Sequence, residues 1–221
     1  MRSYGEYCAI AKSLDVVGDR WTLLVVRELA LRGACRYTDL RNGLPGIASN
    51  LLAERLRDLE AAGVVEREEA PPPVAATLFR LTARGEELRP VLDGLMRWGL
   101  PLMTEQGEGE AVRSHWLVGA LAQMLVDEQP GGPAVALELQ VAAEPIAIEL
   151  RGGSVEIGVG PLEGPDATLS GPPRPVMGLL LGLIELPEAE ADGVGFTGDP
   201  AILDRVGARA VSVGRGARDG E

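Results

Sequence analysis

The stretch PGIASNLLAERLRDLEAAG, residues 45–63, constrains the fold more than any other part of the sequence. A Pro-Gly break precedes it, a glycine ends it, and Leu52, Leu56 and Leu59 recur at helical spacing. We expect one helix over residues 50–62, with these leucines turned into a core. The opposite face of that helix is left for solvent or for a partner.

Segments of different type flank this helix in a definite order. The hydrophobic spacing changes from helical to strand-like after Gly63 and returns to helical near Ala83. We expect helices at residues 9–18, 19–33, 36–44, 50–62 and 83–103, strands at 64–70 and 76–82, and a proline turn between the strands. Asp19 and Ser49 are the expected N-caps of the second and fourth helices. The order predicts a winged helix-turn-helix domain, although a small α+β enzyme domain can share it.

The charge of the chain is distributed unevenly, which bears on whether the protein can approach nucleic acid. The formal net charge is −12, and this disfavours contact with a phosphate backbone. Residues 1–105 nevertheless hold 14 basic and 15 acidic side chains, whereas residues 106–221 hold 7 and 18. The acidity therefore belongs to the second half, and the asymmetry predicts two domains with different partners.

The second half has the pattern of a mixed α+β domain behind a polar linker at residues 104–112. We expect a helix at 114–129, strands at 134–142, 145–153, 154–160 and 166–171, a helix at 175–186, a strand at 193–199 and a closing helix at 200–207. Apolar and polar residues alternate in the first strands, which predicts a mainly antiparallel sheet with one buried face. The expected domains cover 1–103 and 113–213, followed by a disordered tail at 214–221.

Several classes of protein find no support in this sequence. It has no apolar run long enough to span a membrane, and its N-terminus lacks the apolar stretch of a secretory signal. The two cysteines, Cys8 and Cys35, are too few for a disulfide framework. The sequence has no phosphate-binding loop, dinucleotide fingerprint, nucleophile motif or metal-ligand cluster. We expect a cytoplasmic protein that is not an enzyme and holds no cofactor or metal.

Six segments of the first half carry a family resemblance. They are YC at 7–8, GDRWTLLVVREL at 18–29, RYTDL at 36–40, LPGIASNLLAERLRDLEAAGVV at 44–65, FRLTARGEEL at 79–88 and VLDGLMRWG at 91–99. In order and spacing they resemble the HxlR family of bacterial winged-helix transcription regulators. The resemblance implies a homodimer that binds a pseudo-palindromic operator in double-stranded DNA. The helix at 49–62 would enter the major groove, and the hairpin would touch the backbone.

The outward face of that helix then holds the candidate base contacts. With the leucines turned inward, a rotation of about 100° per residue places Asn50, Ala53 and Arg57 outward. Asn50 can pair with adenine and Arg57 with guanine, and the small Ala53 permits close approach or contact with a thymine methyl group. Each of these side chains can instead belong to an ordinary hydrated helix face.

Four further residues are candidates for DNA contact. Ser49 and Arg55 can reach bases or phosphates from the same helix. Arg36 and Tyr37, at the start of the preceding helix, suit phosphate contacts, although Tyr37 can equally belong to the core.

The hairpin departs from the family pattern because it is acidic. Glu66, Glu68 and Glu69 would repel phosphates, and Arg67 and Arg80 are its only cations. We therefore expect weak, strongly salt-sensitive DNA binding with few backbone contacts.

The second half resembles the sterol-carrier-protein-like domains over residues 113–210. The segments that carry this resemblance are PIAIELRGGSVEIGVG, PDATLSG, VMGLLLG and GFTGDPAILDRV. The resemblance implies an α/β sandwich with an apolar tunnel between sheet and helices. Candidate pocket residues are Trp116, Leu121, Met124, Leu125, Met177, Leu180, Leu181 and Ile184. These residues can equally form a plain core, and the negative charge of this half favours an uncharged, cationic or apolar ligand over an acidic one.

Cys8 stands where the resembled family often carries a cysteine, and some members sense oxidants or electrophiles there. A sensing thiol needs exposure and a lowered pKa, which Lys12 would favour and Glu6 would oppose. The alternative is a small residue buried at the dimer interface.

Two functions of different class follow from the sequence. The first is a homodimeric transcription regulator whose second domain responds to a small hydrophobic or uncharged effector. The second is a lipid or hydrophobe carrier that uses its winged helix only to dimerise.

Overall fold

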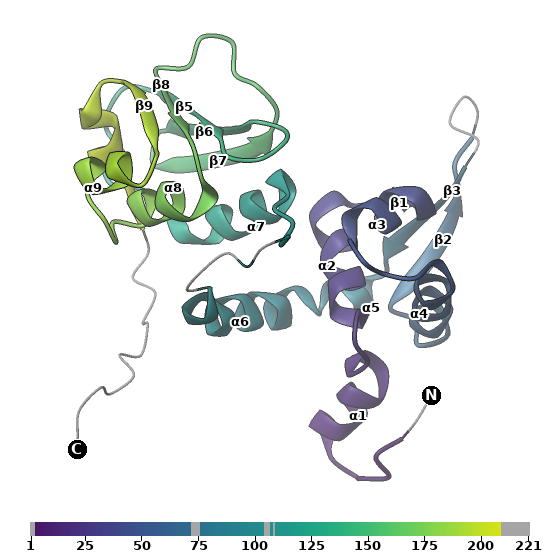
Figure 1. The fold of residues 1–221 in the computed structure, drawn as a ribbon. Coiled ribbons are helices and arrows are strands. Elements are labelled where there is room, and N and C mark those ends of the chain that lie inside the picture. Colours follow the sequence, from purple (N-terminus) through teal and green to yellow (C-terminus); the bar gives the residue numbers. More distant parts are fainter. Residues whose placement is uncertain (1–2, 72–75, 104–106, 108, 209–221) are drawn as a thin grey trace, which may run out of the picture. The chain divides into compact units, whose positions relative to one another are not determined.

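The computed structural model describes residues 3–71, 76–103, 107 and 109–208. The chain divides into two compact units, residues 1–98 and 99–221 (Figure 1). Residues 104–106 and 108 of the expected linker lie outside the described residues, as does the whole of the expected tail at 214–221.

The first unit is a helical body with a small sheet. Its elements are α1 (Ala9–Val17), α2 (Thr22–Arg32), β1 (Cys35–Arg36), α3 (Tyr37–Gly43), α4 (Ser49–Ala61), β2 (Val65–Glu69), β3 (Thr77–Leu81), α5 (Ala83–Glu86) and α6 (Arg89–Gly99). β3 lies between β1 and β2, antiparallel to both. The predicted winged helix-turn-helix arrangement is confirmed. The short strand β1 was not predicted, because two residues give no alternation that the sequence could reveal.

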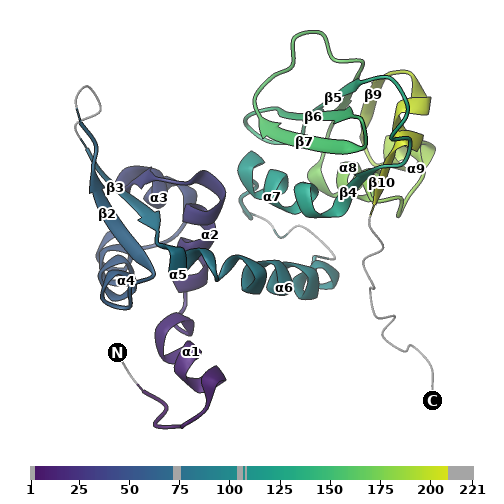
Figure 2. The ribbon, with the colours of Figure 1, turned by 180° about the vertical axis from the view of Figure 1, so that it is seen from behind.

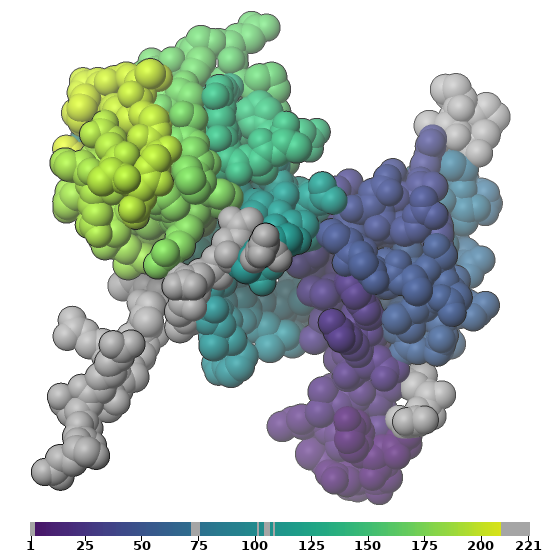
Figure 3. All heavy atoms as spheres, in the orientation of Figure 1, coloured from purple at the N-terminus to yellow at the C-terminus, as the bar shows by residue number. Residues whose placement is uncertain are grey.

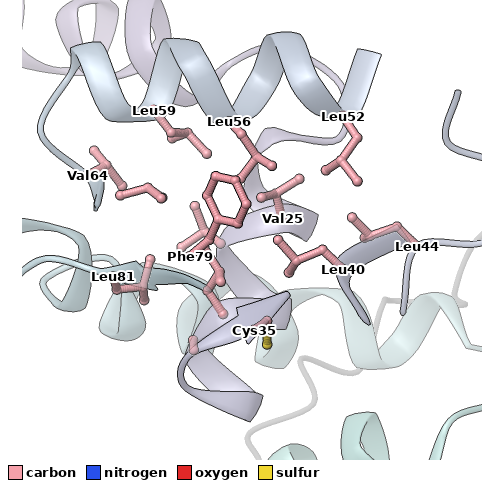
Figure 4. Close-up of a cluster of buried hydrophobic side chains, with 14 of the residues drawn as sticks. Val25, Cys35, Leu40, Leu44, Leu52, Leu56, Leu59, Val64, Phe79 and Leu81 are labelled. Carbon is pink, nitrogen blue, oxygen red and sulfur yellow. The ribbon is translucent and has the colours of Figure 1, made fainter. Parts of the chain in front are cut away.

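The leucine stripe of α4 forms one wall of the core of the first unit. Leu52, Leu56 and Leu59 are at most 1% exposed. Figure 4 shows all three pointing from α4 toward Phe79 of β3 and Val25 of α2. Burying three leucines in this way contributes several kcal/mol, at roughly 1.5–3 kcal/mol for each side chain. The predicted inward face of this helix is confirmed.

Two of the expected helix caps are wrong. α2 begins at Thr22, and its N-cap is Trp21, which adopts a left-handed backbone conformation with φ of 79°. α4 begins at Ser49, with Ala48 at the N-cap and no side-chain hydrogen bond to the helix. The carboxylate of Asp19, freed from capping, binds Arg55 instead.

The second unit contains a two-stranded and a five-stranded sheet with helices. Its elements are η1 (Leu100–Leu102), α7 (Ser114–Met124), β4 (Leu125–Asp127), β5 (Val135–Gln140), β6 (Ile146–Arg151), β7 (Ser154–Val159), β8 (Ala167–Ser170), α8 (Pro173–Leu180), α9 (Leu186–Ala191), β9 (Gly195–Gly198), η2 (Pro200–Arg205) and β10 (Val206–Ala208). The larger sheet has the order β7-β6-β5-β8-β9, and only β5 and β8 run parallel. The mainly antiparallel sheet is confirmed.

The helices of this unit lie along one face of the larger sheet (Figures 1 and 2). Along β6, Ile146, Ile148 and Leu150 are buried in the core with Leu121 of α7 and Val176 of α8. The intervening side chains of β6 are only partly buried or exposed, which matches the alternation in the sequence.

Three expected helices of the second unit are too long. The helix expected at 175–186 ends at Leu180. The helix expected at 114–129 ends at Met124, and the closing helix expected at 200–207 is a 3-10 segment that ends at Arg205. The residues that follow them, β4 and β10, pair with each other in antiparallel fashion. Pairing between strands this far apart in the chain leaves no local signal in the sequence. The predicted bounds of these two helices were therefore too long, because they followed helical spacing alone.

Candidate nucleic-acid interface

The helix-turn-helix consists of α3, a short turn and α4. Pro45 and Gly46 make the turn, and Gly46 has a φ of 85°, which favours glycine. Ile47 is buried beneath the turn. The hydroxyl of Tyr37 donates a hydrogen bond of 2.6 Å to the carbonyl oxygen of Ser49, so the start of α3 is joined directly to the start of α4.

The outward face of α4 is polar and accessible. Ser49, Asn50 and Arg57 are exposed, and Ala53 between them is half-buried. Among the described residues, Arg57 makes no ion pair, whereas the carboxylates of α4 pair with Arg55 or Arg67. The structure therefore brings four of the predicted DNA-contacting residues onto one face.

Arg55 does not share this face, which corrects the prediction. It is 8% exposed, and its guanidinium binds the carboxylates of Asp19, Glu54 and Asp58. Its helical phase is compatible with this position, since a rotation of about 100° per residue puts it within roughly 60° of Leu52 and roughly 40° of Leu59, and its carboxylate partners hold it there. Arg55 is therefore not a candidate for direct DNA contact.

The start of α3 offers one accessible cation. Arg36 is exposed, and its backbone N–H donates to the carboxylate of Asp39 at 3.1 Å, which closes the first turn. Tyr37 is half-buried against the core, and its hydroxyl is occupied by Ser49. The ring of Tyr37 therefore belongs to the core, while contact between this residue and phosphate stays a prediction.

Glu28 is a structural residue of the helix-turn-helix that the sequence reasoning missed. Its side chain is fully buried in α2 and pairs with Arg27 at 2.9 Å and Arg32 at 3.3 Å. A Cβ atom at Gly43 would collide with this carboxylate, so a larger residue where α3 ends would displace the Glu28 side chain. A glutamate within the apolar run of residues 21–31 was the available signal, because a buried carboxylate needs nearby cations.

The hairpin of β2 and β3 uses its arginines internally. Arg80 pairs with Glu66 at 2.7 Å and with Glu68 at 3.2 Å. Arg67 pairs with Glu60 of α4 at 2.5 Å, and its guanidinium lies 5.4 Å from the ring centre of Phe79. The hydrogen bond to Glu60 raises the pKa of Arg67. Both cations keep part of their surface in water, but carboxylates of the protein already neutralise them.

Cys8 is exposed at the N-cap of α1. The nearby backbone N–H groups of Ala11 and Ile10, at the start of α1, lower the pKa of its thiol. The expected contribution of Lys12 is replaced by these helix N–H groups, and Lys12 instead lies 3.6 Å from Asp15. Cys35 differs in every respect, since it is buried and burial raises the pKa of its thiol to about 11.

The candidate pocket residues of the second unit lie in or against its core. Leu121, Met124, Leu125 and Leu180 are buried, while Trp116, Met177, Leu181 and Ile184 are half-buried. A hollow of about 90 Å³ lies elsewhere, along β5 and β6, and none of the eight candidates lines it. It is lined by Ala134, Val135, Ala136, Glu149, Leu150, Arg151 and Asp166.

Within the part of the chain that the structure describes, no three His, Cys, Asp or Glu side chains gather as they would around a metal ion. Within the same residues, no helix combines the length and apolar character needed to cross a membrane.

Comparison with known proteins places this geometry in a family. A sequence model of the HxlR-like helix-turn-helix matches residues 16–107. The chain is 37% identical over 95 residues to the HTH-type transcriptional regulator sll1512 of Synechocystis sp., covering 43% of this chain and 70% of that protein. It is 34% identical over 87 residues to the HTH-type transcriptional regulator YvaP of Bacillus subtilis, covering 39% and 80%. The solved structure of reduced YodB from B. subtilis is similar at 29% identity and a TM-score of 0.39, over 46% of this chain and 99% of that one.

The helix-turn-helix and its hairpin thus define a DNA-binding transcription regulator of the winged-helix class. The chain belongs to the HxlR-like helix-turn-helix family.

Proposed function

We propose that the protein is a homodimeric regulator that reads a pseudo-palindromic operator through α4. The observation that carries this proposal is the outward face of α4. Asn50 and Arg57 are exposed there, and Arg57 has no ion-pair partner among the described residues. An arginine that the protein itself does not neutralise is available to guanine or to phosphate. The family match favours this function over that of a carrier.

The proposed dimer rests on two apolar stripes of the first unit. Exposed apolar side chains recur at helical spacing in or beside two helices. They are Tyr7, Ile10 and Leu14 at α1, and Val91, Leu95 and Trp98 on α6. Figure 3 shows α1, in purple, projecting from the rest of the first unit, which leaves its side chains open to a partner. Exposed apolar patches of this kind mark protein-protein contacts, and a second copy of the chain is the partner proposed.

The second unit is proposed to be a sterol-carrier-protein-like sensor of a small hydrophobic or uncharged effector. Its support is the five-stranded sheet covered by helices on one face, together with the acidic charge of this half. Such an effector changes operator affinity only if it binds two dimer geometries with different affinity. A thermal-shift screen of neutral hydrophobic compounds, followed by operator binding with each compound that raises the melting temperature, tests this step.

Operator binding tests the main proposal. The DNA upstream of the protein's own coding region is the first probe, followed by genome-wide binding, at several salt concentrations. We expect a sequence-specific complex whose affinity falls steeply as the salt concentration rises. The variants Asn50→Ala and Arg57→Ala should bind the operator more weakly than the parent. Arg174→Ala, an exposed arginine of the second unit, is the matched control and leaves binding unchanged. The regulator function is wrong if no specific complex forms even at low salt.

A thiol response through Cys8 is a second candidate function. It is favoured by the exposure of Cys8 and by the helix N–H groups that lower the pKa of its thiol. Mass spectrometry after brief alkylation at neutral pH should find Cys8 labelled and Cys35 unlabelled. Peroxide should then change operator binding by the parent protein but not by Cys8→Ser. An equal change in that variant would contradict the role of Cys8.

A further inference from the structure

An ion pair of Arg55 joins α4 to the corner between α1 and α2. Nη1 of Arg55 binds the carboxylate of Asp19. Its Nη2 lies 2.5 Å from Glu54 and 3.2 Å from Asp58, both of which belong to α4 itself. Of these three carboxylates, only Asp19 comes from another element, so only that contact can orient α4 relative to its surroundings.

The burial of Arg55 makes the contact selective for one geometry. The side chain of Arg55 is 9% exposed, whereas that of Asp19 is 68% exposed. A buried guanidinium requires a carboxylate within reach. Because the guanidinium is planar, it donates well to a carboxylate only over a narrow range of directions. The leucines of α4 hold the helix against the core without such directionality, because apolar contact depends on area.

Small rotations of α4 about its axis matter for a DNA-reading face. A side chain lies roughly 5–6 Å from the helix axis, so a rotation of about 10° displaces its tip by about 1 Å. Displacement of that size disrupts paired hydrogen bonds from Asn50 or Arg57 to a base edge.

The corner that carries Asp19 is set by α1. Asp19 follows α1 by two residues, and the N–H of Gly18 between them donates to the carbonyl of Leu14 at 2.9 Å. A Cβ atom at Gly18 would collide with that same carbonyl, and Trp21 beyond it adopts a left-handed conformation. The carbonyl oxygen of Asp19 also accepts from the N–H of Thr22 at 3.1 Å, so the backbone holds Asp19 between the end of α1 and the start of α2.

We infer that Arg55 is a positioning residue for the recognition helix, and that its ion pair with Asp19 makes the orientation of the reading face depend on the placement of α1. This inference rests on the proposed reading of DNA by α4. It assigns Arg55 no contact with DNA. α1 also carries an exposed apolar stripe. A change in the contacts of α1 would therefore alter the orientation of Asn50 and Arg57 through the ion pair between Asp19 and Arg55.

A double-mutant cycle in the full-length protein tests the inference. The variants are Asp19→Asn, Arg55→Met and the double variant, measured for operator affinity at a temperature where circular dichroism shows each to be folded. We expect about tenfold weaker binding for each single variant and no further loss in the double variant, as for two residues that act together. Asp19→Glu, which retains the charge, should recover most of the affinity.

Asp58→Asn is the matched control, because it removes a partner of Arg55 that lies on α4 itself. We expect it to change operator affinity less than twofold. The inference is overturned if the folded Asp19→Asn variant binds like the parent while only its melting temperature falls. It is equally overturned if Asp58→Asn weakens binding as much as Asp19→Asn.

Hydrogen exchange separates this inference from the proposed function. If the parent binds no DNA, the regulator function fails, but the ion pair can still be tested. Asp19→Asn should then speed amide exchange both in residues 18–22 and in the first turns of α4, and Asp58→Asn should not. Unchanged exchange in α4 would contradict the positioning role whatever the outcome with DNA.

Discussion

Among the described residues, each unit buries one arginine side chain, and the two are held in different ways. Arg55 of the first unit is 8% exposed and Arg205 of the second is 3% exposed. The carboxylates around Arg55 keep 38% to 68% of their side-chain surface in water. Arg205 instead faces Asp127, whose side chain is fully buried.

The ion pair between Arg205 and Asp127 has the geometry of a rigid, fully hydrogen-bonded contact. Nε and Nη2 of Arg205 donate to the two oxygens of Asp127 at 2.8 and 3.0 Å, and Nη1 donates to the carbonyl of Pro133. Asp127 also accepts from the backbone N–H groups of Gln129 and Gly153. The pair thus joins the ends of β4 and η2 to the turn between β6 and β7.

The difference teaches what each arginine is suited to do. A pair whose carboxylate is buried and fully hydrogen-bonded has no alternative partner, so it holds one structure. A pair whose carboxylates face water loses less when it opens, because solvent takes up the released carboxylate, although the buried guanidinium of Arg55 then lacks that partner. The first arrangement suits a fold that must stay closed, and the second suits a helix whose orientation is adjustable.

The largest expected effect is on the stability of the second unit. Asp127→Asn leaves Arg205 buried without a counter-charge, which should lower the free energy of unfolding by about 3 to 5 kcal/mol. Urea unfolding followed by Trp116 fluorescence, in a background with Trp21→Phe and Trp98→Phe, reports this unit alone. Glu156→Gln on the exposed side of β7 is the control. If Asp127→Asn lowered the free energy of unfolding no more than the control does, Arg205 would not be the more firmly held of the two buried arginines.

The same pair predicts how acid acts on this unit. The hydrogen bonds from Arg205 lower the pKa of Asp127 from 3.8 to about 2. Because the folded pKa is the lower one, the contribution to stability is fully present above 3.8 and is lost as the pH falls toward about 2. The midpoint of urea unfolding, followed by Trp116, should fall across this range in the parent and less steeply in Asp127→Asn. Parallel slopes would show that the pair does not govern acid unfolding.

Most elements of the fold could be predicted because their signals are local. The leucine stripe of α4, the alternation in β6 and the glycine or proline breaks between them each act over a few residues. Residues that act through distant partners could not be predicted in this way. β1, β4 and β10 are short strands whose pairing partners lie far along the chain. Asp19 stands before a helix like a cap, yet Arg55 lies 36 residues away and binds it.

The outward face of α4 could be predicted from helical phase, and the error at Arg55 came from setting phase aside. Residue type alone suggested a DNA contact, whereas the angle from Leu52 already placed this side chain on the inward side. The internal use of Arg67 and Arg80 had a visible signal in the neighbouring glutamates. The partners of buried groups, such as Gly43 beside Glu28, become visible only when the helices pack.

Arg57, which makes no ion pair with any described residue, should matter for DNA binding and not for folding. Arg57→Ala should weaken operator binding by about 1 to 3 kcal/mol, as expected for loss of a bidentate base contact. Its free energy of unfolding should stay within about 0.5 kcal/mol of the parent value, since the side chain is exposed. Fluorescence anisotropy with labelled operator and urea unfolding measure the two quantities. If Arg57→Ala lowered stability without lowering operator affinity, Arg57 would be a residue that stabilises the fold, like Arg205, and not a DNA contact.

The smallest expected effect comes from releasing a paired arginine. In the double variant Glu66→Gln, Glu68→Gln, both charged partners of Arg80 are gone, so its guanidinium becomes available to a phosphate. Operator binding at low salt should tighten by less than about 1 kcal/mol, because exposed ion pairs are worth little. The salt dependence should steepen by about one phosphate contact, which is the sharper measurement. Arg80→Ala added to the double variant should abolish both gains. If the gains persist without Arg80, removal of negative charge from the hairpin caused them, and the distinction between paired and free arginines would not extend to the wing.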